Sequence, residues 1–203
     1  GQRKSSSSIK GAFSWLLIND SLSSTITFYN LLLKPMNKEI LKSIVFFCLL
    51  LILSRLIPHP PNFTPLIAGA IFLPFLIKDK WLIICLPILC LLISDFFLGF
   101  HTVMIWTYGS FFLIGLMASQ FSSTKLTTLN GLSLSSPTLF FLITNFGVWL
   151  GSSIYSQDIQ GLVQCYILAL PFYASSLSAT LLFANLFYFC RQFFINRSLS
   201  NQV

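Results

Sequence analysis

The sequence predicts an all-α integral membrane protein, a six-transmembrane-helix bundle with both termini in the cytoplasm (N-in/C-in). Three observations lead to this prediction. Charged residues make up only 8% of the 203 residues and hydrophobic ones 55%, whereas an average soluble domain has roughly 25% charged residues. Six apolar runs are candidates for helices in a bilayer, and the basic residues gather between alternate runs. Water is therefore not the solvent expected for most of this surface.

The expected spans follow one another along the chain. They cover residues 40–57, 65–78, 81–100, 102–119, 136–153 and 162–190, and a membrane-spanning helix needs roughly 20 apolar residues. The second run is short and holds Pro65 and Pro74, so we expect it to be tilted or broken. The last run is long and should kink at Pro171, which lacks an N–H. Both should face the bundle, because such interruptions are tolerated only against protein or a cavity. The polar, Ser/Thr-rich segment 120–135 is expected to be a loop.

The basic residues set the expected orientation. If the first span runs outward, eleven of the 12 Lys and Arg residues lie on the cytoplasmic side: Arg3, Lys4, Lys10, Lys34, Lys38, Lys42, Lys78, Lys80, Lys125, Arg191 and Arg197. Only Arg55 lies outside. This is the asymmetry of the positive-inside rule. The excess of 12 basic over 5 acidic residues is therefore interpreted as topology, and no nucleic-acid binding is predicted.

The first 35 residues differ from the rest. They are rich in Ser and basic, with Asp20 as their one acid, a composition similar to a presequence. A credible start follows at Met36. We expect residues 1–35 to be an N-terminal extension or a weakly ordered interfacial segment, and residues 36–203 to be the six-helix membrane domain.

Conspicuous polar and aromatic residues gather at the outer side. The stretch RLIPHPPNFTP contains four prolines, which make a stiff loop with little conformational freedom to lose on binding. It would form a lid or rim, or only a tight connecting turn. We expect a substrate site formed by Arg55, His59, Asn62, Asp95, His101, Trp106, Tyr108, Asn145, Trp149 and Tyr166. The tryptophans alternatively belong to an interfacial aromatic belt.

Asp95 is the most informative of these residues. A carboxylate within a span costs about 2.5–3.5 kcal/mol at mid-helix unless it is paired or hydrated, and Arg55 is its expected partner. The pair either braces two spans or lines a pocket. In the segment SDFFLGFH, Gly99 follows Asp95 by four residues and should share its helix face, where it would permit close approach.

Metal-binding and catalytic alternatives rest on His59, His101 and Asp95, since imidazole and carboxylate suit several divalent ions. Their spacing matches no metal motif, and GxSxG and HExxH are absent from the sequence. The cysteines Cys48, Cys85, Cys90, Cys165 and Cys190 show no CxxC or zinc-ligand spacing and are expected to act as small hydrophobes. No enzyme activity, metal site or cofactor is predicted.

Four segments carry a resemblance to a known family: RLIPHPPNFTP, SDFFLGFH, TNFGVW and GLVQCYILALPF. Together they look like a family of small bacterial inner-membrane proteins of unassigned function that are described as transport proteins. That family is similar in size, span count and orientation to the substrate-binding S components of energy-coupling factor (ECF) vitamin transporters. The resemblance implies an S-component-like fold in the bacterial inner membrane. It also implies a vitamin or cofactor precursor as ligand and an ECF-type energising module as a candidate partner.

The first span departs from the S-component pattern. S components carry a face of small residues there for docking to the coupling subunit, whereas this span reads IVFFCLLLILS. The expected function is capture of a small vitamin-like molecule from the outer side, in a pocket between spans and loops. The alternatives are a membrane scaffold or assembly protein, and an intramembrane enzyme or metal-binding protein that uses Asp95, His59 and His101.

Overall fold

The computed structural model describes residues 38–121, 125–151 and 153–200, and these contain helices and no strand. The elements are α2 (Lys38–Leu56), α3 (Leu66–Phe72), the 3-10 helix η1 (Leu73–Phe75), α4 (Lys80–Leu98), α5 (Met104–Gln120), α6 (Leu126–Gly151) and α7 (Ile159–Ser200). From Lys42 onward the chain forms one compact unit, and the packing below belongs to it. The predicted all-α class is confirmed, whereas the extension predicted at 1–35 lies outside the described residues.

The segment predicted as a loop at 120–135 is largely helical, and that prediction was wrong. Helix α6 already begins at Leu126. Its first turns bury Leu129, Leu132, Ser133 and Ser136, which are spaced as one face of a helix. Ser133 suits this position because its Oγ donates to the carbonyl of Leu129 at 2.8 Å, whereas the buried Ser136 Oγ has no hydrogen-bond partner within the described residues. The polar composition of this segment therefore concealed the helical spacing of its buried residues.

Three helices are long and apolar enough to cross a membrane: Lys80–Leu98, Leu126–Gly151 and Ile159–Arg197. A shorter apolar helix covers Leu66–Phe75. Helix α5 has 17 residues, and α2 carries charged residues near both ends. Large apolar side chains lie on the outside of the unit, for example Phe46, Phe96 and Ile105 with exposed fractions of 70%, 73% and 76%. Such a surface suits lipid and indicates a membrane protein.

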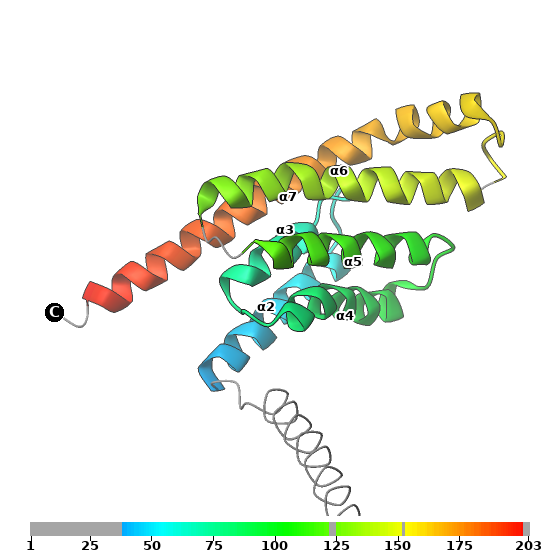
Figure 1. Cartoon of the computed structure of the whole chain (residues 1–203). Coiled ribbons are helices and arrows are strands. Elements are labelled where there is room, and N and C mark those ends of the chain that lie inside the picture. Colours follow the sequence, from blue (N-terminus) through cyan, green and yellow to red (C-terminus); the bar gives the residue numbers. More distant parts are fainter. Residues whose placement is uncertain (1–37, 122–124, 152, 201–203) are drawn as a thin grey trace, which may run out of the picture. The chain divides into compact units, whose positions relative to one another are not determined.

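The short helix α3 lies at the centre of the unit. All seven of its residues are buried, and it contacts α4, α5, α6 and α7 (Figure 1). Gly69 lets α2 approach, because a Cβ at this position would lie 2.6 Å from Leu51 Cδ1. The helix then changes to the 3-10 form at Leu73–Phe75, which contains Pro74. The second apolar run is thus broken and faces the bundle, as predicted.

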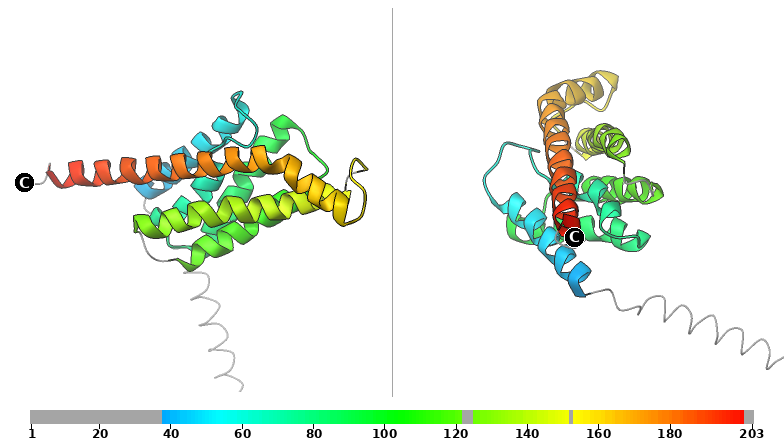
Figure 2. Two further views of the ribbon diagram at one scale, coloured as in Figure 1. Left: turned by 90° about the horizontal axis from the view of Figure 1, so that it is seen from above. Right: turned by 90° about the vertical axis from the view of Figure 1, so that its left-hand side faces the viewer.

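The remaining helices pack in chain order, α4 on α5, α5 on α6 and α6 on α7 (Figure 1). Gly115 of α5 lies against α4, where a Cβ would come 2.9 Å from Ile84 Cα. Helix α7 has 42 residues with Pro171 in its interior. Figure 2 shows that it bends in its N-terminal half, the half that contains this proline. Because a proline removes one hydrogen bond of the helix, the bend has a local cause.

Candidate functional site

Each of the described α-helices α2 to α7 contributes residues to a cavity of about 480 Å³. Its lining comes from the C-terminal ends of α2, α4 and α6 and from the N-terminal ends of α3, α5 and α7, together with the connections between them. This arrangement arises because successive helices alternate in direction. The volume lies within the roughly 300–1,000 Å³ that is usual for small-molecule sites.

Five of the ten residues predicted for the site line this cavity: Arg55, His59, Asn62, His101 and Asn145. They come from four parts of the chain, namely the end of α2, the α2–α3 connection, the α4–α5 connection and α6. His59, Asn62 and His101 are exposed and Arg55 is half-buried, so these residues form the open rim. The other five predicted residues do not line the cavity.

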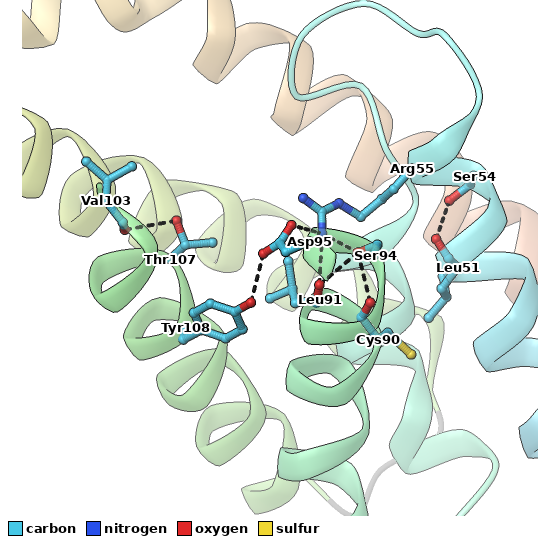
Figure 3. Close-up of polar contacts among 10 residues, drawn as sticks. All are labelled: Leu51, Ser54, Arg55, Cys90, Leu91, Ser94, Asp95, Val103, Thr107 and Tyr108. Atoms are coloured by element: carbon cyan, nitrogen blue, oxygen red, sulfur yellow. Dashed lines mark hydrogen bonds and ion pairs between the residues drawn. The ribbon is translucent and has the colours of Figure 1, made fainter. Parts of the chain in front are cut away.

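Asp95 lies beside the cavity and holds Arg55 in place (Figure 3). Its side chain is 2% exposed, and Oδ1 lies 2.8 Å from Arg55 Nη1. The same Nη1 donates to the Ser94 hydroxyl and, at 3.4 Å, to the carbonyl of Leu91. The predicted pairing is therefore present, and it fixes a guanidinium group at the end of α2. Within the described residues no acceptor contacts Nη2 or Nε of Arg55.

Tyr108 completes this network from α5. Its hydroxyl donates to Asp95 Oδ2 at 2.8 Å (Figure 3), so both carboxylate oxygens have a partner. A buried carboxylate is tolerated only with such partners. Asp95 and Tyr108 are thus positioning residues for Arg55 and do not themselves reach the cavity.

Gly99 follows Asp95 by one helical turn, but the close approach predicted there is absent, because a Cβ at Gly99 would meet nothing within 4 Å. It is the C-cap of α4, with φ of 94°. Its N–H donates to the carbonyl of Asp95 at 2.8 Å. Glycine adopts this left-handed backbone without a steric cost, so the residue ends the helix and begins the connection that carries His101.

The proline-rich connection between α2 and α3 is fastened at several points. The N–H of Phe63 donates to the carbonyl of Pro60 at 3.0 Å, which closes a turn with Pro61 and Asn62 at its centre. Asn62 has φ of 61°, and a positive φ after proline is typical of a type II turn. The carbonyl of Pro61 accepts a hydrogen bond of 2.8 Å from Ser175 Oγ of α7. This rim segment is therefore held against the wall of the cavity.

The tryptophans and Tyr166 have packing roles. Trp106 lies against Gly147, where a Cβ would overlap the indole ring, and makes an edge contact with Phe146. Trp149 Nε1 donates to the carbonyl of Ser156 at 2.9 Å, within the connection to α7.

Tyr166 joins α7 to α6 by donating to the carbonyl of Leu142 at 2.6 Å. Together, these contacts fix the ends of α5, α6 and α7 relative to one another.

The inner wall contains residues that the sequence analysis did not include. It is formed largely by aromatic and hydroxyl side chains of α5, α6 and α7: Phe111, Phe140, Phe141, Thr144, Phe172, Tyr173 and Ser176. The rings of Phe141 and Tyr173 are in contact, with their centroids 4.8 Å apart and their planes tilted by 37°. The one available signal was proximity, since Thr144 precedes Asn145 and Phe172 follows Pro171.

Hydroxyl and amide groups remain available along this wall. Ser176 is only 3% exposed, lines the cavity and has no side-chain partner within the described residues. Asn145 Nδ2 donates to the carbonyl of Phe141 at 2.8 Å, which leaves Oδ1 as an acceptor. The wall thus offers a few placed polar groups among aromatic surfaces, which is the usual composition of a ligand site.

The acid and imidazole groups do not gather into a metal centre. In the described part of the chain no three residues among His, Cys, Asp and Glu come together in a way that could hold an ion. His59 Nδ1 lies 2.6 Å from the carbonyl of Ile57, so this nitrogen donates. The carboxylate of Asp95 is already bound by Arg55 and Tyr108.

The fold and the site together define an α-helical membrane protein with a cavity of ligand size at one end of its bundle. Residues 35–200 match the model of a family of unknown function (DUF6580). The chain belongs to this family. No curated protein and no solved structure matches the chain.

Proposed function

We propose that this protein captures a small molecule in the cavity from the extracytoplasmic side and serves its transport, as the S components of ECF vitamin transporters do. The observation that carries the proposal is the convergence of the described α-helices α2 to α7 on a cavity of about 480 Å³. A scaffold protein has no need of a cavity walled by so many separate segments. Ligand sites of helical bundles, by contrast, are built between the helices in this way.

The charge distribution supports the proposed orientation. Lys42, Lys78, Lys80, Lys125 and Arg191 lie near the helix ends opposite the cavity. By the positive-inside rule that end faces the cytoplasm. We therefore propose six spans with both termini inside, in the bacterial inner membrane, and a cavity that opens outward.

The ligand class and the partner follow from the resemblance to S components. It implies a vitamin or cofactor precursor as the ligand and an ECF-type energising module as the partner. The first span presents Phe46, Leu49 and Leu53 on its exposed surface where S components present small residues. We propose that the protein acts alone or through a docking surface of a different shape.

The test is to fill the cavity. Ala169 of α7 lines it and is 6% exposed, and Thr144 of α6 lines it from the neighbouring helix. Ala169→Phe and Thr144→Phe should each occupy the space of a ligand. Ala174→Phe is the matched control, because Ala174 is exposed on the same helix and does not line the cavity.

The readout is thermal unfolding of the purified full chain with a panel of vitamins and cofactor precursors. At least one compound should raise the melting temperature of the wild type and of Ala174→Phe, since a ligand that binds only the native state stabilises it. The same compound should leave Ala169→Phe and Thr144→Phe unchanged. Equal stabilisation of all four proteins, or of none, would contradict binding in the cavity.

A further inference from the structure

The described residues that line the cavity include basic side chains and no acidic ones. Three of its lining residues carry or can carry a positive charge: Arg55, His59 and His101. No Asp or Glu is among the described residues that line it. The nearest carboxylate, Asp95, is 1% exposed and has both oxygens bound by Arg55 and Tyr108. A ligand in the cavity therefore meets these basic groups, and the one carboxylate near them already pairs with Arg55.

The guanidinium group of Arg55 has hydrogen-bond donors beyond those used in its protein contacts. Its three protein contacts, to Asp95, Ser94 and Leu91, all use Nη1. Nη2 and Nε have no acceptor within the described residues, while the side chain is 16% exposed and lines the cavity. An unpaired guanidinium N–H in a poorly hydrated place favours a charged acceptor, and the planar fork fits a carboxylate or phosphate with two parallel bonds.

The histidines extend this donor group around the rim. The Nδ1–H of His59 is used by the carbonyl of Ile57, which points Nε2 away from the backbone. His101 follows the glycine cap of α4 and has no side-chain partner among the described residues. When protonated, both imidazoles add donors beside Arg55. They come from two connections that enter the cavity from different helices.

The part of the cavity formed by α5, α6 and α7 is aromatic, in contrast to the basic rim. Phe111, Phe140, Phe141, Phe172 and Tyr173 line the cavity, and the rings of Phe141 and Tyr173 contact each other with their centroids 4.8 Å apart. Phe111 is 2% exposed and Phe172 is 45% exposed, so the aromatic wall runs from the protein interior to the surface. Aromatic walls bind planar rings by offset or edge contacts. The ligand site thus has a cationic mouth and an aromatic interior.

Resting on the proposed function, we infer that the ligand is a ring-bearing organic anion, with a carboxylate or phosphate group held by Arg55, His59 and His101 and its ring among Phe140, Phe141 and Tyr173. A neutral ligand would leave the donors of Arg55 unmatched, at the cost of their desolvation. A cationic ligand would be repelled at the mouth. An anionic phospholipid offers the same acid group, but its acyl chains do not need an aromatic wall.

The experiment compares acids with neutral compounds that carry the same ring. The probes are benzoate against benzamide, nicotinate against nicotinamide, and phenyl phosphate against phenol. Binding to the full chain in nanodiscs of neutral lipid is measured by saturation-transfer NMR, which detects weak ligands. The acid of each pair should bind about tenfold more tightly or better, the value of one hydrogen bond between charged groups.

Variants test whether the rim residues cause the preference for acids over neutral compounds. Arg55→Gln should remove most of the difference between acid and amide, and Arg55→Lys should keep part of it, because a lysine retains the charge without the fork. Ala174→Phe should behave as the wild type, and Ala169→Phe should bind none of the probes. Nanodiscs of anionic lipid test the other source of phosphate. If they displace the acids from the wild type, while the acids fail to displace lipid, the assignment to a soluble anion is overturned.

The outcomes separate the two proposals. If the neutral probes bind as tightly as the acids, and Ala169→Phe abolishes their binding, the inferred anion is wrong while ligand binding in the cavity stands. If no acid shows binding that Ala169→Phe abolishes, at millimolar concentration, the inference is overturned. If in addition no vitamin or cofactor precursor stabilises the wild type, the proposed function fails as well.

Discussion

At the scale of single residues, the Arg55–Asp95 pair combines the two roles that the sequence left open. Asp95 is 1% exposed and behaves as a brace between α2 and α4, whereas Arg55 also lines the cavity. A carboxylate in this place fixes a guanidinium group that would otherwise have many rotamers. Under the proposed function, the carboxylate contributes to ligand recognition through the residue it positions.

This division of roles predicts different results for stability and for binding. Asp95→Asn should lower the free energy of unfolding by about 3–5 kcal/mol, because it leaves Arg55 without its buried partner. Arg55→Gln should also destabilise the protein, and the double variant should recover much of the loss. Binding of benzoate should be weak in Arg55→Gln and remain weak in the double variant. Unfolding in denaturant and saturation-transfer NMR measure the two quantities.

The double variant is the decisive member of this set. If it recovers binding together with stability, Arg55 is needed only by Asp95 and not by the ligand. If stability is unchanged in both single variants, the pair is not the brace that its burial implies. Trp81→Ala is a suitable control, since Trp81 is 72% exposed at the opposite end of α4.

At the scale of elements, the α2–α3 connection depends on Asn62, which has φ of 61°. Asn62→Gly should keep the turn and the melting temperature, because glycine adopts this conformation freely. Asn62→Val should cost roughly 1–2 kcal/mol, the penalty of a left-handed backbone for residues with a Cβ. Thermal unfolding of the two variants tests this. Equal melting temperatures would show that the turn has a different conformation in the membrane.

The start of α7 depends on Asp158. Its Oδ1 accepts hydrogen bonds of 2.7 Å from the N–H of Gly161 and from Ser156 Oγ. These bonds, that of Gly161 first, hold the pKa of Asp158 below its usual value. A carboxyl group with a lowered pKa in the folded state stabilises the protein above its unfolded pKa, about 3.9, and this contribution is lost as the pH falls through the folded value.

Asp158→Asn should therefore be less sensitive to acid than the wild type. The amide keeps an oxygen for the N–H of Gly161 but does not titrate, so its melting temperature should change less between about pH 6 and pH 3, on either side of the usual aspartate pKa. Asp158→Ala should be destabilised at both pH values, since it has no capping group. Identical pH profiles for Asp158→Asn and the wild type would show that the cap does not contribute.

The element scale also shows what could be predicted from the sequence. The apolar runs predicted α2, α4 and α5 to within a few residues, because length and hydropathy determine them. The start of α6 could not be found in this way, since Ser133 and Ser136 are buried there and hide the helical period. The rotation of each helix about its own axis, which decides which residues face the cavity, could not be predicted either. Trp106 and Asn145 both lie near the cavity, and only Asn145 lines it.

The aromatic wall could not be predicted for a related reason. The chain has 22 phenylalanines, and lipid, protein core and ligand cavity all accept this residue. Polar residues were more informative, because each needs a partner or water at membrane depth. For that reason Arg55, His59, Asn62 and His101 were found from the sequence, and Phe140, Phe141 and Tyr173 were not.

At the scale of the whole molecule, the alternation of helix directions connects site and topology. The cavity gathers the ends of α2, α4 and α6 and the starts of α3, α5 and α7, so all of these lie on one side of the membrane if each element crosses it. Three helices meet the length and hydropathy needed for a crossing. The short α3 is entirely buried among the others and needs no lipid-facing surface of its own.

This arrangement predicts the result of reporter fusions. A reporter inserted directly after Phe121 should be cytoplasmic, as should one fused after Val203, because Lys125 and Arg191 lie near these points and the positive-inside rule retains them. A reporter inserted after Gln157 should be on the far side, next to the cavity.

The insertion after Phe121 is chosen because α6 begins at Leu126, and an insertion further on would break that helix. Alkaline phosphatase, active only outside the cytoplasm, and a fluorescent protein, active inside, give opposite signals at each position. An external signal after Phe121, or a cytoplasmic one after Gln157, would contradict the six-span arrangement and the outward-facing cavity together.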